Sequence, residues 1–312
     1  MRSFAVSALH EPPFPARRHP ETDRVAGESL AWARALGLVA GAERERRLRR
    51  AAAAELAGRT CPDGPVERLR LLTDLIGWLF VMDDACDDDG LGATPVRLAP
   101  TVAALLAVLD GYGGPGTPPA TRGLAAGLDD ICRRARACGC PALLLRLVSQ
   151  LREYLLALLW EAGYREHHRV PAVAEYVQLR RHTGAARPAF TLTDLAYGPA
   201  ARPGRHAEPA VAALDVLAAD LVCWCNDIFS FGKEHRTGAD PLNLVTSIAR
   251  ESGAGEAVAL RTAAARFNTA LAAYVEGDAA LVGDPDAAGF LAARRNWIRG
   301  TYDWSLRAAR YA

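Results

Sequence analysis

One helical stretch of the chain places three oxygen-bearing side chains on a single line. Residues 217–234 read LAADLVCWCNDIFSFGKE, and their apolar members recur at helical rather than alternating spacing. On this helix Asn226, Ser230 and Glu234 stand four residues apart, and a step of four drifts by only about 40° around the axis. Amide, hydroxyl and carboxylate oxygens are hard ligands of the kind Mg²⁺ prefers. The stretch therefore predicts a metal site, with Lys233 beside it to reach an anion; the alternative is the polar end of an ordinary amphipathic helix.

A second oxygen-rich stretch, residues 74–90, reads DLIGWLFVMDDACDDDG. It predicts an apolar helix that runs into five carboxylates and ends at Gly90; the carboxylates are Asp83, Asp84, Asp87, Asp88 and Asp89. Like charges four residues apart repel, and acid at a helix C-terminus opposes the macrodipole. We therefore expect a cation to neutralise the cluster, which is the argument from the residues for a divalent metal. A solvated acidic helix end is the alternative, and the register of a calcium-binding EF-hand loop fails here.

The composition of the 312-residue chain excludes several classes of protein. It is 50% hydrophobic and 23% charged, as a folded protein is. A net charge of +1 indicates no nucleic-acid-binding surface. No apolar run has the length of a signal peptide or of a membrane span, so no integral membrane contact is expected. The seven cysteines lie mostly in apolar helical stretches, which favours reduced, buried thiols and a cytoplasmic location over a disulfide framework.

Nearly all of the chain after Glu28 has the pattern of helices separated by Gly/Pro clusters. The predicted helices cover 27–39, 42–58, 65–86, 97–111, 118–137, 140–163, 171–197 with a break near Gly184, 207–232, 241–252, 255–282 and 286–310. No segment alternates as a strand does. Residues 1–28, rich in Pro and charge, are expected to form an extended N-terminal arm. With no linker further on, residues 29–312 are expected to form one all-α domain that encloses a cavity.

The order of these motifs resembles the signature of bacterial class I terpene synthases. A DDxxD motif at Asp83, Asp84 and Asp87 is followed by NDxxSxxxE from Asn226 to Glu234. Further features agree with the resemblance, which spans about residues 17–311: Arg180, placed 46 residues before Asn226; the helix-break pair Thr183 and Gly184; the C-terminal Trp297, Gly300, Trp304, Arg310 and Tyr311; and the arm segment from Arg17 to Pro20.

The resemblance implies a single-domain helical bundle around a central active-site cavity and a Mg²⁺-dependent reaction of an isoprenyl diphosphate. It implies three Mg²⁺ ions, with Asp83 binding two of them and Asp84 and Asp87 supporting or sharing that task. Asn226, Ser230 and Glu234 would hold the third. It gives the diphosphate to Arg180, Lys233, Arg310 and Tyr311. Thr183 departs from the usual acidic residue at its position, because a hydroxyl can hydrogen-bond to Arg180 but cannot form an ion pair with it.

Loss of an allylic diphosphate needs stabilisation of the charge that develops on its oxygens, which metal ions and guanidinium groups supply without a protein nucleophile. The carbocation that remains needs a dry, apolar cavity, and aromatic faces stabilise it. Phe80, three residues before Asp83, is one candidate for the cavity wall, and Trp297 and Trp304 are two more. Phe190 and Tyr197 are candidates beyond the helix break. For each aromatic residue, plain core packing is the alternative.

Other activities fit the sequence less well. Prenyl-chain elongating enzymes use a second DDxxD, but Asp129 and Asp130 are followed by Arg133 where the third aspartate is needed. The DxDD motif of class II cyclases is absent. The favoured function is a terpene cyclase that makes a sesquiterpene from farnesyl diphosphate. A diterpene cyclase acting on geranylgeranyl diphosphate is the alternative, a non-enzymatic helical scaffold is the alternative from another class, and a homodimer is left open.

Overall fold

Helices make up most of the described part of the chain, which comprises residues 8–111, 113, 117–197, 205–236 and 242–308 of a computed structural model; of residue 205 and residues 233–236 only the backbone is described. These ranges contain no strand, so the predicted all-α fold is confirmed. The first α-helices are α2 (Thr22–Ala35), α3 (Ala42–Ala51), α4 (Ala53–Thr60), α5 (Val66–Asp87), α6 (Pro95–Leu109) and α7 (Arg122–Arg136). The later ones are α8 (Pro141–Glu166), α9 (Val173–Thr183), α10 (Ala186–Tyr197), α11 (Pro209–Arg236), α12 (Leu244–Ser252), α13 (Glu256–Leu281) and α14 (Ala288–Arg307).

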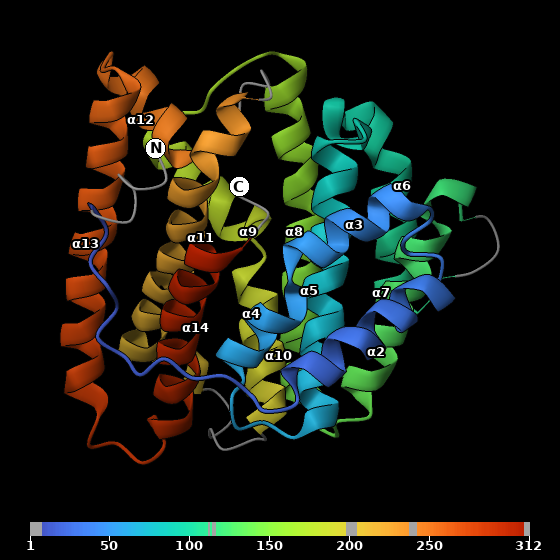
Figure 1. The fold of residues 1–312 in the computed structure, drawn as a ribbon, viewed down its shortest axis with the longest axis horizontal. Helices are drawn as coiled ribbons and strands as arrows, with labels where there is room; N and C mark the ends of the chain where they lie inside the picture. Colours follow the sequence, from blue (N-terminus) through green and yellow to red (C-terminus); the bar gives the residue numbers. More distant parts are fainter. Residues whose placement is uncertain (1–7, 112, 114–116, 198–204, 237–241, 309–312) are drawn as a thin grey trace.

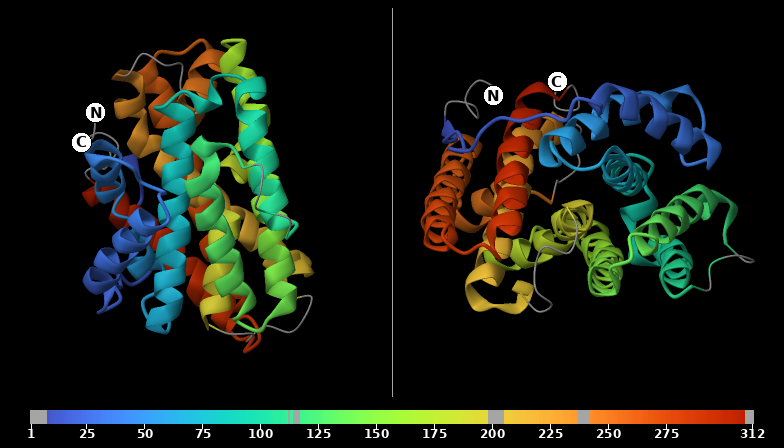
Figure 2. Two further views of the ribbon diagram at one scale, coloured as in Figure 1. Left: turned by 90° about the vertical axis from the view of Figure 1, so that its right-hand side faces the viewer. Right: turned by 90° about the horizontal axis from the view of Figure 1, so that it is seen from below.

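The long helices run roughly side by side (Figure 1) and are arranged in a ring when viewed along their axes (Figure 2). Helix α11 packs against α13 and α14, α4 packs against both α14 and α5, and α8 packs against α6 and α10. Helices α5 and α11 both finish at one end, which we call the upper end of the bundle (Figure 1). Helices α8, α11 and α14 begin at the opposite, lower end. The buried apolar residues of one main core run from Leu9 to Ala308.

The helix boundaries differ from the predicted ones at two places. Helix α2 begins at Thr22, so residues 22–28 are helical and the predicted arm over residues 1–28 is too long. The reason is that Thr22, Val25, Ser29 and Ala33 recur at helical spacing and are buried on one face of the helix. The predicted helix over 42–58 is interrupted at Ala52, which has φ = 51° and separates α3 from α4. Helix α3 is largely exposed, whereas α4 turns inward and buries every residue except Glu55.

The seven cysteines have the environments that the sequence predicts. All seven cysteines are free thiols, and most are buried, as predicted. Burial raises the pKa of the Cys61 thiol to about 11 and that of the Cys225 thiol to about 12. Among the described helices, none combines the length and the apolar character that crossing a lipid bilayer would require.

Candidate active site

The end of α5 divides its five aspartates into two groups. Asp83 and Asp84 are half-buried on the last turns of the helix, whereas Asp87, Asp88 and Asp89 are exposed. The helix finishes at Asp87, and Gly90, with φ = 72°, takes the left-handed conformation that turns the chain away.

Arginines from two other helices neutralise the exposed group. On one side, Arg44 and Arg47 of α3 reach Asp89, with N–O distances of 2.7 and 3.0 Å, and Arg47 lies 3.8 Å from Asp88. On the other side, Arg165 of α8 pairs with Asp87. Arginine side chains therefore offset part of the repulsion among these three carboxylates, and the metal expected at the cluster stays a prediction. The sequence could not reveal this, because the arginines lie tens of residues away along the chain.

The predicted stripe on α11 begins with Asn226 and Ser230. Asn226 is half-buried, and its Oδ1 accepts a hydrogen bond of 2.9 Å from Arg180 Nη2. Ser230 is buried and donates to the backbone carbonyl of Asp227 at 3.3 Å. Lys233 and Glu234 continue the helix, but their side chains lie outside the described residues. The two described members of the stripe thus stand beside the arginine that the sequence singled out.

Arg180 of α9 is held by a buried carboxylate on α11. Its Nε donates to Asp227 Oδ1 at 2.9 Å, and Tyr176 donates its hydroxyl proton to Asp227 Oδ2 at 2.7 Å. Asn243 fixes the same turn by donating to the carbonyl of Asp227 at 2.9 Å. Burial by itself would lower the pKa of Arg180, but attraction to Asp227 outweighs it and the pKa is raised, so Arg180 keeps its charge.

Asp227 is a functional candidate that the sequence analysis missed. Its side chain is only 3% exposed, and burial raises its pKa while the charge of Arg180 opposes that effect. The signal was visible as an ionisable residue inside the apolar run LVCWCNDIFSF, because a buried carboxylate needs a partner. Asp227 also supplies the carboxylate that Thr183 lacks, so the charge partner of Arg180 comes from α11 rather than from the helix break.

The predicted break near Gly184 is present, with α9 ending at Thr183 and α10 beginning at Ala186. A Cβ at Gly184 would lie 2.4 Å from Cys223 Sγ and 2.8 Å from the carbonyl oxygen of Arg180. The left-handed conformation falls on the next residue, Ala185, which has φ = 51°. Gly184 is therefore needed for space rather than for its own backbone angles.

Four of the five aromatic candidates form two separate pairs, which do not include Tyr197. Phe80 of α5 stacks on Trp304 of α14, with ring centroids 5.8 Å apart and an angle of 15° between the planes. Trp297 lies against Phe190 at 5.2 Å and donates its indole N–H to Thr193 Oγ1 at 2.9 Å. Phe190 is fully buried, as a core residue is. Of the remaining predicted site residues, Arg310 and Tyr311 lie outside the described part of the chain.

The chemistry of the donors suits a hard cation. The amide oxygen of Asn226, which accepts from Arg180, is of the type that binds hard metal ions. Ser230 uses its proton for the Asp227 carbonyl, which leaves the lone pairs of its oxygen available. Among the described side chains, no three His, Cys, Asp or Glu residues lie close enough to share an ion. Asp83 and Asp84, on a helix that ends at the same upper end, add half-buried carboxylates.

Comparisons with known proteins agree with this geometry. The sequence profile described as terpene synthase family 2, C-terminal metal binding, matches residues 74–273. The chain is 32% identical over 302 residues to a 4-epi-cubebol synthase ((2E,6E)-farnesyl diphosphate cyclizing) of Streptosporangium roseum, covering 96% of this chain and 90% of that one. It is 32% identical over 318 residues to a (12E)-labda-8(17),12,14-triene synthase of Streptomyces cyslabdanicus, covering 98% and 94%.

The fold itself matches solved structures. A linalool/nerolidol synthase from Streptomyces clavuligerus superposes with a TM-score of 0.83, covering 95% of this chain and 99% of that chain at 22% identity. A helical bundle of this shape, with polar motifs at one end, is the fold of the class I terpene synthases. The chain belongs to terpene synthase family 2, which confirms its predicted membership of the bacterial terpene synthases. It is therefore an enzyme of the lyase class whose machinery includes a divalent metal.

Proposed function

We propose that the protein is a Mg²⁺-dependent sesquiterpene cyclase that ionises farnesyl diphosphate and folds the resulting cation into a ring system. The observation that carries this proposal is the contact of Arg180 with Asn226 and Asp227, with hydrogen bonds of 2.9 Å to each. This contact places a charged donor suited to a diphosphate beside an oxygen ligand that would suit a metal ion. The 32% identity to a farnesyl diphosphate cyclizing enzyme supports the choice of substrate.

Three Mg²⁺ ions would be held by residues of two helices. Asp83, with Asp84 and Asp87 in support, would serve two ions from α5, and Asn226, Ser230 and Glu234 would serve the third from α11. Bound there, the ions would supply Lewis-acid stabilisation of the departing diphosphate. Use of Asp87 requires Arg165 to give up or share its ion pair with that carboxylate.

Arg180 would bind the diphosphate oxygens, with Lys233, Arg310 and Tyr311 as further donors. A guanidinium fork matches the geometry of phosphate oxygens, and Asp227 already holds this fork in place. Because Tyr176 and Asn243 fix Asp227 in turn, little side-chain entropy is lost when the anion arrives. Thr183 and Gly184, at the break after Arg180, would carry any movement of that arginine to the cavity.

The hydrocarbon part of the substrate would lie against apolar walls that exclude water. The stacked rings of Phe80 and Trp304 suit this role, because Phe80 is half-buried and lies one helical turn from Asp83. An aromatic face attracts a cation by about 2 kcal/mol when both are desolvated. Trp297 would contribute from deeper in the bundle, where it packs against Phe190.

Geranylgeranyl diphosphate is the second candidate substrate. The chain is as similar to the labdatriene synthase as to the 4-epi-cubebol synthase, at 32% identity in both cases. A longer chain would need a deeper cavity but the same metal and diphosphate ligands.

Incubation of the purified enzyme with geranyl, farnesyl, geranylgeranyl and farnesylgeranyl diphosphates tests both candidates. Gas chromatography–mass spectrometry should reveal cyclic C15 hydrocarbons or alcohols from farnesyl diphosphate with Mg²⁺, and none with EDTA. Cyclic C20 products alone would replace the first candidate with the second. A folded protein that converts none of the four substrates would contradict the proposed function.

A further inference from the structure

The N-terminal segment crosses three helices and is tied to each of them. We call residues 8–21 the strap; it passes over α13 and α14 before it reaches α2 (Figure 1). At its start, Asn268 of α13 binds the backbone of Ala8 and His10 at 3.0 and 2.8 Å. At its end, the backbone N–H of His19 donates to the carbonyl of Gly58 on α4 at 2.9 Å. The strap is thus attached at both ends to the body of the enzyme.

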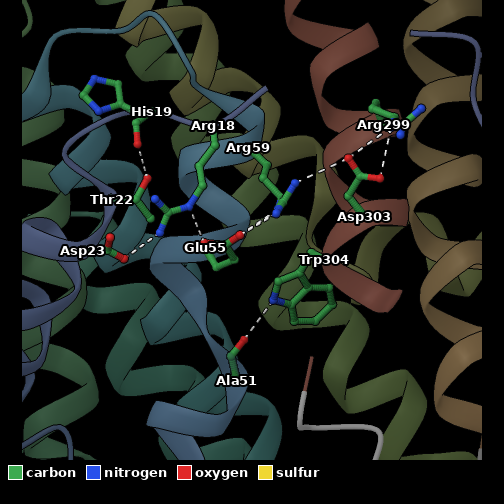
Figure 3. Close-up of polar contacts among 10 residues, drawn as sticks. All are labelled: Arg18, His19, Thr22, Asp23, Ala51, Glu55, Arg59, Arg299, Asp303 and Trp304. Atoms are coloured by element: carbon green, nitrogen blue, oxygen red, sulfur yellow. Dashed lines mark hydrogen bonds and ion pairs between the residues drawn. The ribbon is translucent and has the colours of Figure 1, made fainter. Parts of the chain in front are cut away.

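A series of ion pairs with alternating charge leads from the end of the strap through α4 to α14 (Figure 3). Arg18 of the strap pairs with Glu55 at 2.7 Å, and Glu55 pairs with Arg59 at 2.7 Å, both on α4. Arg59 then reaches Asp303 of α14 at 3.4 Å, and Asp303 accepts from Arg299 at 3.1 Å.

The last arginine of this series returns to the strap. Arg299 pairs with Glu11 at 2.7 Å and donates to the carbonyls of Pro12 and Phe14 at 3.1 and 3.3 Å. The charges therefore form a closed circuit through the strap, α4 and α14, which we call the strap circuit: Arg18, Glu55, Arg59, Asp303, Arg299 and Glu11.

The middle of the strap circuit is buried where α4 meets α14. The side chains of Arg59 and Asp303 are only 5% and 8% exposed. The two helices touch closely there, because a Cβ at Gly300 would lie 3.0 Å from the Cβ of Arg59. Buried ion pairs contribute little net stability compared with apolar packing of the same shape, but they can fix one arrangement of the groups around them.

The arrangement they fix includes the aromatic wall of the site. Trp304 follows Asp303 directly, is 2% exposed, and donates its indole N–H to the carbonyl of Ala51 at 3.2 Å, just before α4 (Figure 3). Its ring stacks on Phe80, three residues before Asp83 on α5. Any shift of α14 against α4 would therefore move the indole against Phe80.

We infer that Arg59 and Asp303 are positioning residues for the reaction. The strap supports them, because its Arg18 and Glu11 close the strap circuit. Their pair sets the register of α14 on α4 and so holds the Trp304 ring where the substrate's carbocation folds against it. This inference rests on the proposed function for the role of Trp304, but the ordering of α14 by the strap circuit does not depend on it.

The test compares variants that separate folding from positioning. D303N and R59Q each remove one charge of the buried Arg59–Asp303 pair, which leaves Arg59 with Glu55 alone or Asp303 with Arg299 alone, and both should lose stability. The double variant R59M/D303L removes both charges and should regain much of that stability, yet it still breaks the strap circuit. R17Q is the matched control, because it breaks a strap ion pair whose side chains, on Arg17 and Asp63, are 46% and 51% exposed.

In R59M/D303L we expect a changed ratio of terpene products and a kcat on the order of 10- to 100-fold lower, as misplacement of a wall by about 1 Å produces. KM should change by less than about threefold, because the diphosphate ligands are untouched. R17Q should keep the wild-type product ratio and kcat. A well-folded double variant with wild-type products and kcat would overturn the inference.

Hydrogen–deuterium exchange gives a second readout that needs no turnover. Backbone amides of residues 300–308 should exchange faster in R59M/D303L than in the wild type, and at the wild-type rate in R17Q. Unchanged exchange in the double variant would overturn the inference even if the enzyme proved inactive on every substrate. Faster exchange in an enzyme that turns over no isoprenyl diphosphate would uphold the ordering role and refute only the proposed function.

Discussion

Two arginines, one towards each end of the bundle, are both held by buried carboxylates, and we propose a chemical role for only one of them. At the lower end, the side chain of Arg294 is 0% exposed. Its Nε donates to Asp215 at 2.6 Å, and its two terminal nitrogens donate to Asp194 at 2.8 Å each. Phe190 and Phe290 cover the guanidinium, with centroids 4.6 and 4.7 Å away. Every nitrogen of this arginine therefore has a carboxylate partner.

Arg180, towards the upper end, is held less completely. Its described hydrogen bonds use Nε and Nη2 and go to one carboxylate, that of Asp227, and to the neutral amide of Asn226. Its side chain is 18% exposed. The comparison teaches that burial alone does not mark a functional arginine. What distinguishes Arg180, our proposed diphosphate ligand, is a guanidinium that Asp227 holds in one direction while part of the side chain stays exposed.

The largest effect should come from breaking the lower-end pair. We expect R294Q to lower the free energy of unfolding by about 3–5 kcal/mol, because Asp194 loses its guanidinium partner and the buried Asp215 keeps only Arg146. R180Q should lose less, since Asp227 keeps the hydrogen bond from Tyr176. Urea unfolding followed by circular dichroism measures both. R152Q is the control, because it breaks the exposed Arg152–Asp110 pair and should lower the free energy of unfolding by less than about 1 kcal/mol. Equal losses in all three variants would show that the two arginines do not differ in their contribution to stability.

A second comparison lies within the upper end, between the half-buried and the exposed aspartates of α5. We expect D83N to lower turnover by about 100-fold or more, because Asp83 is our proposed charged ligand to the metal. D89N should leave turnover near the wild-type level, since Asp89 is exposed and occupied by Arg44 and Arg47. Steady-state kinetics at several Mg²⁺ concentrations measures this. If D89N impaired turnover as much as D83N, the division of the cluster would be wrong.

The helix break beside Arg180 gives a prediction about packing. G184A should destabilise the enzyme by about 1–3 kcal/mol, because the new methyl group would overlap Cys223 Sγ and crowd the Arg180 carbonyl. Adding C223A should restore part of that stability by making room. Burial raises the pKa of the Cys223 thiol to about 12, so no thiolate is lost with it. Thermal unfolding of the single and double variants checks this. If the stability changes of G184A and C223A simply added in the double variant, the contact between the two residues would be contradicted.

The smallest effect concerns pH at the lower end. His206 lies 3.7 Å from Asp194, and Arg146, Arg294 and Asp215 also act on it. Burial lowers its pKa in the folded state, so the unfolded chain binds the proton more readily. Its contribution to stability is therefore complete above the unfolded pKa of about 6.5 and declines as the pH falls below it.

The free energy of unfolding of the wild type should fall between about pH 6.5 and 5. We expect H206N to make this fall smaller, by less than about 1 kcal/mol. H167N, which replaces a histidine whose side chain is 67% exposed, is the matched control. Identical pH dependence in the wild type and H206N would show that the lower end does not titrate in this range.

Much of this arrangement could be predicted from the sequence, because it rests on local signals. The periodicity of residues 217–234 and the Gly/Pro punctuation located α11, the end of α5 and the break near Gly184. Partners contributed by other helices could not be predicted. Asp227 as the carboxylate for Arg180, and Arg165 for Asp87, follow from how helices pack, which short-range patterns do not encode. The left-handed Ala52 was missed because alanine carries no turn signal.

The comparison of the two arginines is tested most directly by the binding of inorganic pyrophosphate with Mg²⁺, measured by isothermal titration calorimetry. The wild type should bind, and R180Q should bind at least about tenfold more weakly, a loss of about 1.4 kcal/mol. R294K, which keeps the charge at the lower end, should bind as the wild type does. Unchanged affinity in folded R180Q would contradict the assignment of this arginine to the diphosphate and, with it, the location of the active site.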